Sequence, residues 1–440
     1  MILVKKSAKA KERGQILVIL AIGLVAILGI AGLAIDGSRI YEARRQNQST
    51  ADSAVLTAAG VAQNYIKDAQ PEIFYCDLDE ATSLTRQASD IGITSAQIAV
   101  KDDGITLQRY NITSNGITSK CGVDGVRTYM DFTARITTTT NTTLARVIGI
   151  NSIPTVATAT ARIYPYQSAA YGNAISSLNL SCGGIDLSGT MDLTIYKGGI
   201  FSNSCINGNG GPQVDVQTSG IQYGATYDPP TAGSISPEPE HTNDRLNLDN
   251  LIAKPPCPDS GYSAPPSVNG NPGNYTGIKV NNNDTLTLAP GLYCLKGDID
   301  VAANATLNAQ GVTFAMVTGS TTFNGTAKLY LHAPTCDSNA DPDCVPDGFT
   351  PETAYLKGVL FYVFPTNLST ITLNGNSDNE FTGLIYAPKA LVKITGTSGS
   401  KTFNTQIIGW NVVIEGNATM VMDQNSSDTF HYQSSMDMVK

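Results

Sequence analysis

The sequence predicts a mainly β protein that begins with a transmembrane or pilin-like long α-helix, continues in a small α+β module and ends in a parallel β-helix-like domain. Three observations predict this order. Residues 16–35 are an unbroken apolar run, small residues then recur every three or four positions to residue 69, and a short unit of alternating apolar residues recurs after residue 168.

The apolar run has the length of a membrane anchor. About 20 residues at about 1.5 Å per residue span about 30 Å, which is the thickness of a bilayer's hydrocarbon core. A cleaved secretory signal is the alternative, but its apolar core has about 7–15 residues, so the length favours an uncleaved anchor. Residues 1–15 form a basic tail, and this charge predicts that the N-terminus stays in the cytoplasm. Its basic residues are Lys5, Lys6, Lys9, Lys11 and Arg13.

The rest of the chain is acidic and carries all the cysteines. Beyond residue 35 there are 23 basic and 36 acidic residues, which argues against a nucleic-acid partner. The cysteines suit an oxidising compartment, and we expect sequential neighbours to pair. Zinc is disfavoured because no Cys-x-x-Cys occurs and the three histidines are far apart in sequence. The expected disulfides are Cys76 with Cys121, Cys182 with Cys205, Cys257 with Cys294, and Cys336 with Cys344.

Residues 36–70 predict a helical stalk that continues the anchor. Apolar and small residues, among them Ile40, Ala43, Ala58 and Ala62, form one stripe at helical spacing, and no helix breaker occurs before Pro71. Small side chains allow close approach, so we expect this stripe to pack against a domain or a neighbouring subunit.

The N-terminal segment also carries a set of residues in a characteristic order around the apolar run. They are Arg13, Gly14, Gln15, Asp36, Tyr41, Arg44, Arg45, Ala51, Asp52 and Ala54. With these residues, about the first 60 positions resemble the N-terminal segment of the TadE/TadG-like proteins of Flp (tight adherence) pilus systems. The resemblance implies an inner-membrane or envelope component of a bacterial pilus assembly machine, with other assembly proteins or pilin subunits as partners of the helix.

Residues 71–167 predict the small α+β module. A helix is expected over residues 79–91, where carboxylates occupy the first turn. Strands are expected over residues 98–100, 105–110, 127–138 and 156–164, and a short helix over 142–148.

Residues 168–435 predict the β-helix-like domain. Alternating apolar residues and Gly- or Asn-rich turns recur in coils of about 20 residues, as at 371–381, 392–403 and 412–422. An ordinary antiparallel sandwich remains the alternative because the spacing is irregular. Residues 227–275 interrupt the pattern with many prolines and predict a surface excursion.

One short motif in the β-helix-like domain is a candidate metal site. The motif resembles the metal-binding Asp-x-Ser-x-Ser of von Willebrand factor A domains and consists of Asp186, Ser188 and Thr190. Such a site needs a helix directly after the motif, whereas an alternating strand pattern follows here, which favours a solvated turn.

Three functions follow as hypotheses. The first is a membrane-anchored, non-enzymatic structural or adhesive component of a Tad-type apparatus, with no cofactor. The second is a membrane-tethered protein that binds or cleaves surface polysaccharide, as β-helices often do. The third is a minor pilin, but cleavage after Gly14 would place Ile19 where pilin-like members carry Glu. Candidate charges for the second are Asp298, Asp300, Glu380, Lys389, Lys393 and Glu415, and candidate aromatic residues, expected mostly in the core, are Tyr293, Phe361, Tyr362, Phe364, Tyr386 and Trp410.

Overall fold

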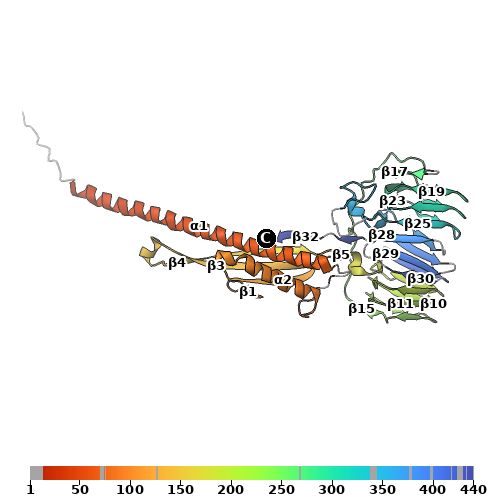
Figure 1. Cartoon of the computed structure of the whole chain (residues 1–440), viewed down its shortest axis with the longest axis horizontal. Coiled ribbons are helices and arrows are strands. Elements are labelled where there is room, and N and C mark those ends of the chain that lie inside the picture. The colour runs from red at the N-terminus through yellow and green to blue at the C-terminus, as the bar shows by residue number, and fades with distance from the viewer. Residues whose placement is uncertain are drawn as a thin grey trace, which may run out of the picture.

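The protein consists of a long stalk and a β-solenoid that lies across the end of the stalk (Figure 1). The structure is a computed structural model. It describes residues 13–69, 74, 76–124, 127–266, 269–336, 344–375, 379–396, 400–417, 419–423, 430–432 and 434–439.

The helix α1 (Arg13–Ala69) is continuous from the apolar run into the stalk, as predicted. Its 57 residues give a length of about 85 Å at about 1.5 Å per residue. The apolar side chains from Leu17 to Ile35 are exposed, whereas Ala51, Ala54 and Ala58 are buried on one side of the helix. In the described part of the chain, α1 is the one helix that is long and apolar enough to cross a membrane.

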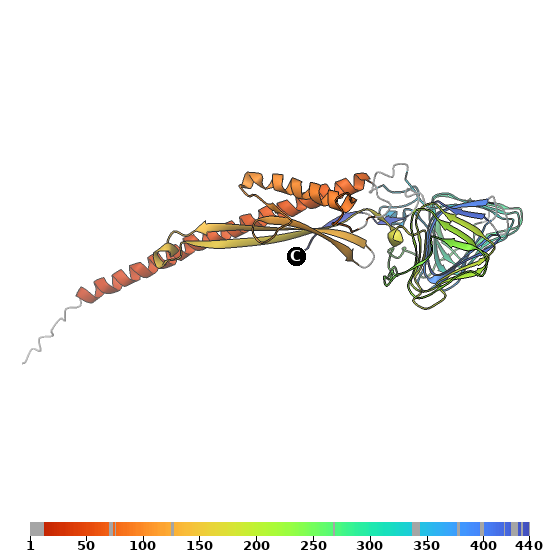
Figure 2. The same cartoon turned by 90° about the horizontal axis from the view of Figure 1, so that it is seen from below.

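A five-stranded sheet packs along the outer half of α1 (Figure 2). Its order is β1-β2-β3-β4-β32, and all neighbours are antiparallel except β1 and β2. The long hairpin of β3 and β4 runs beside α1 and ends in a 3₁₀ turn, η2 (Ala145–Ile148). The strands are β1 (Gln108–Arg109), β2 (Gly116–Asp124), β3 (Arg127–Asn141), β4 (Ser152–Tyr164) and β32 (Ser435–Val439).

The second helix begins later than the sequence predicted. The helix α2 spans Leu84–Ala99 because the Ser83 Oγ accepts the Arg86 N–H at 3.0 Å and caps its first turn. The carboxylates of Asp79 and Glu80 therefore precede the helix, and the strand predicted over residues 98–100 is wrong. The strand predicted over 105–110 is reduced to β1, and a short 3₁₀ turn η1 (Lys101–Asp103) precedes it.

Small residues let the two helices approach closely. A Cβ on Gly92 of α2 would lie 2.6 Å from the Ala58 carbonyl oxygen and 3.2 Å from the Phe132 ring. Phe132 belongs to the buried core that α1, α2 and the sheet share. The alanine stripe of α1 is therefore the surface on which the stalk is built.

The C-terminal domain is a parallel β-solenoid of about 11 turns, and its strands stack into three faces. Face 1 contains β6 (Ile175–Ser177), β9 (Ile200–Ser202), β12 (Ile221–Tyr223), β15 (Glu240–His241), β17 (Gly273–Tyr275), β20 (Gly291–Lys296), β23 (Val312–Thr318) and β26 (Val359–Val363). Face 2 contains β7 (Ile185–Gly189), β10 (Ile206–Gly210), β13 (Tyr227–Asp228), β18 (Ile278–Val280), β21 (Ile299–Val301), β24 (Thr321–Phe323) and β27 (Ile371–Gly375).

Face 3 and two long strands complete the coils. Face 3 contains β8 (Asp192–Ile195), β11 (Gln213–Val216), β14 (Ser234–Ser236), β16 (Asn269–Gly270), β19 (Thr285–Leu288), β22 (Thr306–Ala309), β25 (Lys328–His332) and β30 (Thr419–Met422). The strands β28 (Glu380–Gly396) and β29 (Ser400–Gly416) bend around all three faces.

The coils stack in parallel register, which confirms the parallel β-helix. Val392 pairs with Val412, and Val412 pairs with Ile185, so equivalent apolar positions form one buried column. Every pairing between the described strands of the solenoid is parallel, and the antiparallel sandwich is therefore wrong.

The chain does not build the coils in sequence order. The last coil consists of the second half of β29 followed by β30. In this coil β29 pairs with β6 and β7, and β30 pairs with β8, so the first and last coils are neighbours. The coils up to β15 extend one way from this junction, and the coils from β16 fill the other side (Figure 1). The stalk consequently meets the solenoid near its middle.

The proline-rich segment has two parts. Residues 227–241 are a further coil, so the predicted excursion begins too early. Residues 242–262, which we call the strap, cross face 1 from one end of the solenoid toward the other. The Leu246 N–H donates to Asn203 Oδ1 at 2.7 Å, and the Tyr386 hydroxyl donates to the Leu248 carbonyl at 2.6 Å. The disulfide between Cys257 and Cys294 holds the far part of the strap.

After residue 422 the chain returns to the stalk, so the solenoid is shorter than the predicted range of 168–435. The strand β31 (His431–Tyr432) pairs with β5 (Gln167–Ser168), next to a short turn η3 (Ala169–Gly172), and β32 completes the stalk sheet. Two chain segments therefore join the stalk to the solenoid.

Replacing Gly92 with Ala tests the close helix contact. We expect Gly92→Ala to lower the free energy of unfolding of the stalk by about 1–3 kcal/mol, because the new methyl group meets the Ala58 carbonyl. Gly60→Ala is the matched control, since nothing lies within 4 Å of its Cβ position, and it should stabilise α1 by about 0.5–1 kcal/mol. Calorimetry of the full chain in detergent measures both. Equal effects of the two variants would contradict the packing described.

Removing the Tyr386 hydroxyl tests the strap. Tyr386 is fully buried, donates to Leu248 and accepts the Leu251 N–H at 3.3 Å. We expect Tyr386→Phe to cost about 1–3 kcal/mol because both backbone groups lose their partner, and to speed proteolysis of the strap. Tyr355→Phe, which loses one bond to the Lys254 carbonyl at the surface, should have a smaller effect. Unchanged cleavage in Tyr386→Phe would show that this bond does not hold the strap.

Candidate functional site

The end of the stalk that adjoins the apolar run contains a buried carboxylate, Asp36. Asp36 is only 4% exposed. Its Oδ1 accepts the Thr143 N–H at 2.7 Å, and its Oδ2 accepts the N–H groups of Leu144 at 3.0 Å and Ala145 at 2.7 Å. The side chain thus ties the tip of the β3–β4 hairpin to α1, and it satisfies N–H groups that no strand pairs.

The bonds at Asp36 favour the ionised carboxylate. The backbone N–H groups of Ala145 and Thr143 hold the pKa of the Asp36 carboxyl below its usual range. A lowered pKa means that these contacts stabilise the fold above the ordinary Asp pKa of about 3.9. The stabilisation is lost as the pH falls through the lowered value.

Gly32 allows the hairpin tip to contact the helix one turn earlier. A Cβ at Gly32 would lie 2.5 Å from Leu144 Cδ1 and 2.7 Å from Leu144 Cβ. In contrast, nothing lies within 4 Å of the corresponding positions at Gly23 and Gly29. The contact places Leu144 against the last turns of the apolar run, and sequence reasoning did not identify this role of Gly32.

A polar cluster fixes the hairpin further along the stalk. Asn47 is buried on the stripe of α1, and its Nδ2 donates to the Thr138 Oγ1 at 2.9 Å and to the Thr155 Oγ1 at 3.0 Å. The Arg39 guanidinium donates to the Thr143 Oγ1 at 2.6 Å. With Asp36, these bonds set the register of the hairpin along the helix.

The polar family residues of α1 that follow Asp36 face outward, whereas the alanines face inward. Tyr41 is 71% exposed, Arg44 and Arg45 are exposed, and Asp52 is partly exposed. At about 100° per residue, Tyr41, Arg45 and Asp52 lie on the side of the helix opposite Asp36; we call them the outer stripe. Ala51 and Ala54 are buried on the inner side. Arg13, Gly14 and Gln15 lie in the first turn of α1, and their side chains are outside the described part.

The structure does not assemble the candidate metal residues into a site. Asp186 and Ser188 point outward from face 2, where the Asn209 Nδ2 donates to the Asp186 Oδ1 at 3.1 Å. The Thr190 hydroxyl donates to the Asn417 Oδ1 at 2.9 Å. Within the described residues, no group of three or more His, Cys, Asp or Glu side chains could hold a metal ion.

The charged candidates for polysaccharide chemistry are dispersed. Asp300 and Lys393 share face 2, but β24 and β27 separate their strands, which places them about 14 Å apart at about 4.8 Å per strand. Lys393 pairs with Glu415 at 2.7 Å, and Glu380 pairs with His332 on face 3 at 3.3 Å. The other two are Asp298, which accepts from the Ser320 N–H and hydroxyl, and Lys389, which pairs with Asp249 of the strap.

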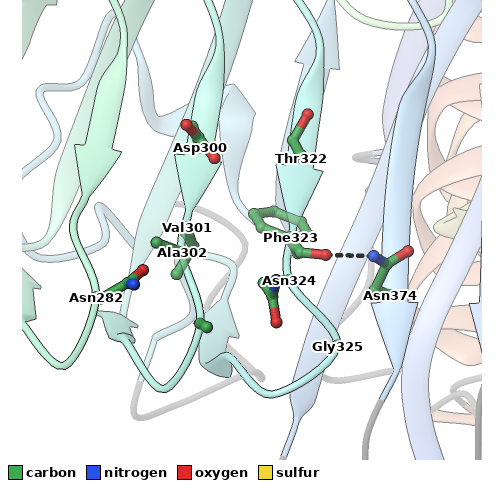
Figure 3. Close-up of a pocket in the computed structure, with 10 residues that line it drawn as sticks. Asn282, Asp300, Val301, Ala302, Thr322, Phe323, Asn324, Gly325 and Asn374 are labelled. Atoms are coloured by element: carbon green, nitrogen blue, oxygen red, sulfur yellow. Dashed lines mark hydrogen bonds between the residues drawn. The ribbon is translucent and has the colours of Figure 1, made fainter.

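A shallow hollow of about 550 Å³ lies at the edge of face 2 beside Asp300 (Figure 3). The Asn374 Nδ2 donates to the Phe323 carbonyl, and Asp300 is the one charged residue of the lining. The hollow offers amide and hydroxyl groups for hydrogen bonds, whereas hydrolysis of a glycosidic bond needs two carboxyl groups about 5–10 Å apart. Its lining residues are Asn282, Asp300, Val301, Ala302, Ala303, Thr322, Phe323, Asn324, Gly325 and Asn374.

The candidate aromatic residues belong mainly to the core, as expected. Tyr293 and Phe361 point inward, and Tyr362, Phe364 and Tyr386 are buried in the cluster between face 1 and the strap. Burial raises the pKa of Tyr362 to about 12, so its hydroxyl stays protonated. Trp410 is partly buried, and the Lys389 ammonium lies 4.5 Å from its ring centroid.

Four disulfides lie beyond α1 in the chain, and each joins the expected neighbours. Cys76–Cys121 lies in the stalk, and Cys182–Cys205, Cys257–Cys294 and Cys336–Cys344 lie in the solenoid domain.

Replacing Asp36 with Asn tests the carboxylate contact. The amide has one acceptor oxygen in place of two, so we expect faster hydrogen exchange at Thr143, Leu144 and Ala145 in Asp36→Asn at neutral pH. In the wild type, the same three amides should lose protection only when the pH falls below the ordinary Asp range. Asp52→Asn, which alters an exposed bond from Gln48, is the control. Protection that is identical in Asp36→Asn and the wild type would contradict the assignment.

Comparison with protein families confirms the N-terminal resemblance. Comparison of the chain with curated proteins and with solved structures found no match. The family match spans the apolar run, Asp36, the outer stripe and the buried alanines. Residues 14–62, which we call the Tad segment, match the family model described as "Putative Flp pilus-assembly TadE/G-like".

Proposed function

We propose that the protein is a membrane-anchored, extracytoplasmic structural component of a Tad (Flp) pilus assembly system. The observation that carries the proposal is the single helix α1, which is apolar and exposed over the Tad segment's first half and packs against its own sheet over the second half. The first half is the membrane anchor, and the second half holds the solenoid away from the bilayer.

The orientation is part of the proposal. The basic residues before the apolar run keep the N-terminus in the cytoplasm. The solenoid then lies outside the cytoplasmic membrane, where its disulfides are stable. Alkylation of thiols in intact spheroplasts before and after reduction tests this orientation, since thiols that react before reduction would contradict it.

The outer stripe is the surface through which the helix binds other assembly proteins or pilin subunits. Tyr41 and Arg45 are exposed on the side of α1 that the stalk's own sheet leaves uncovered, and exposed Tyr and Arg residues are typical anchors of protein interfaces. The stalk fold does not use them, so a partner outside the chain accounts for their position.

Surface polysaccharide is the second candidate ligand. The polar outer positions of face 2 and the hollow beside Asp300 suit hydrogen bonds with sugar hydroxyls. We propose binding and not cleavage, because the hollow is lined by one carboxylate, Asp300, whereas hydrolysis of a glycosidic bond needs two carboxyl groups. Glycan-array binding by the solenoid domain with its stalk tests this role. We expect binding by the wild type that is weakened in Asp300→Ala, whereas no binding by the wild type would leave a purely structural role.

A paired substitution on the outer stripe tests the proposed function. We expect Tyr41→Ala combined with Arg45→Ala to reduce surface pili strongly, while membrane abundance and the thermal stability of the stalk stay at the wild-type level. Ser49→Ala combined with Ser53→Ala, two exposed changes on the flank of the same helix, should leave piliation intact. Electron microscopy and immunoblotting of sheared surface material measure the effect. Normal piliation of a strain that lacks the whole chain would refute the proposal.

A further inference from the structure

The tip of the β3–β4 hairpin carries apolar side chains that the described residues leave largely exposed. In the short stretch of residues 144–150, Val147 is 82% exposed and Ile148 is 73% exposed, and Leu144 and Ile150 are also exposed. A contiguous group of this kind on a protein surface marks a site that contacts a membrane or another molecule.

The position of this tip along α1 identifies what contacts it. Leu144 packs against Gly32, which precedes Asp36 by four residues and therefore lies about 6 Å further into the apolar run. The exposed side chains of Leu33 and Ile35 stand at the same level of the helix. The hairpin tip and the end of the anchor thus form one continuous apolar surface.

The hairpin is held at this level and does not hang freely. The Asp36 carboxylate accepts three N–H groups of the tip, and Arg39 donates to Thr143. The guanidinium group of Arg39 contacts Thr143 at the tip, and Arg146 belongs to the tip itself. Lipid phosphates at this level would neutralise the charges of both guanidinium groups. Because Asp36 accepts three backbone N–H groups of the tip, these groups do not need water as a partner. This lowers the free-energy cost of moving the tip into a less polar medium.

We infer that residues 144–150 insert into the outer interfacial layer of the same bilayer that α1 crosses. This inference rests on the proposed membrane anchorage. The hairpin is a second contact with the membrane, beside the helix, and it fixes the tilt and rotation of the stalk relative to the bilayer, which a single helix leaves free.

Depth-dependent fluorescence quenching tests the inference on the full chain. All eight native cysteines form disulfides, so an introduced cysteine supplies a thiol for an environment-sensitive dye. The protein is reconstituted in phosphatidylethanolamine–phosphatidylglycerol vesicles that contain nitroxide lipids with the spin label at the head group or along the acyl chain. The labelled positions are Val147→Cys and Ile148→Cys at the tip, Gly23→Cys in the anchor and Ser53→Cys on the stalk.

We expect the dyes at residues 147 and 148 to report a depth of about 5–10 Å below the head groups, as an inserted interfacial segment would. The dye at residue 23 should lie deeper, and the dye at residue 53 should not be quenched. Quenching at residue 23 without quenching at 147 and 148 would overturn the hairpin inference and leave the anchor intact. The absence of quenching at residue 23 would refute the anchor itself and the inference with it.

Discussion

The packing of one face of α1 against the stalk sheet is the interaction on which the rest of the molecule depends. The same helix is apolar all round before Asp36 and buried on only one side after it. Because no break separates the two parts, the position of the sheet on the helix also fixes the position of the solenoid relative to the apolar run. The small residues Ala54, Ala58 and Gly92 let the elements approach closely, and Asp36 and Asn47 set the register.

The solenoid meets this stalk through its middle because of its chain order. The coil that begins at β6 stacks on the coil that ends at β30, so both connections to the stalk leave from adjacent coils. The cost of this arrangement is a crossing from one end of the stack to the other, which the strap provides over face 1. At the end formed by β13, β14 and β15, prolines such as Pro230 and Pro239 hinder pairing with a further strand. At the other end, Ser263 bridges Tyr275 of β17.

The parts of the fold that depend on local periodicity could be predicted from the sequence. The apolar run, the stripe of α1 and the apolar positions of the coils were identified, since each needs only the spacing of side chains along one element. The order of the coils could not be predicted, because equivalent positions such as Val412 and Ile185 identify a column but not their neighbours in it. The contact of Asp36 with Thr143 was also missed, since 107 residues separate the partners and no local pattern records the contact. The start of α2 differs from the prediction because Ser83 caps the helix, and Asp79 and Glu80 therefore precede its first turn.

The division of the Tad segment between an inner and an outer side argues that the segment serves two purposes. Asp36, Ala51 and Ala54 are explained by the fold of this chain, because each is buried against the hairpin or the sheet. Tyr41 and Arg45 are not explained in this way, because they are exposed and the fold stands without them. The exposure of Tyr41 and Arg45 leaves this face of α1 open along the part of the helix that follows the apolar run. On the proposed function, the outer stripe is therefore the surface through which the stalk joins other components of the pilus machinery.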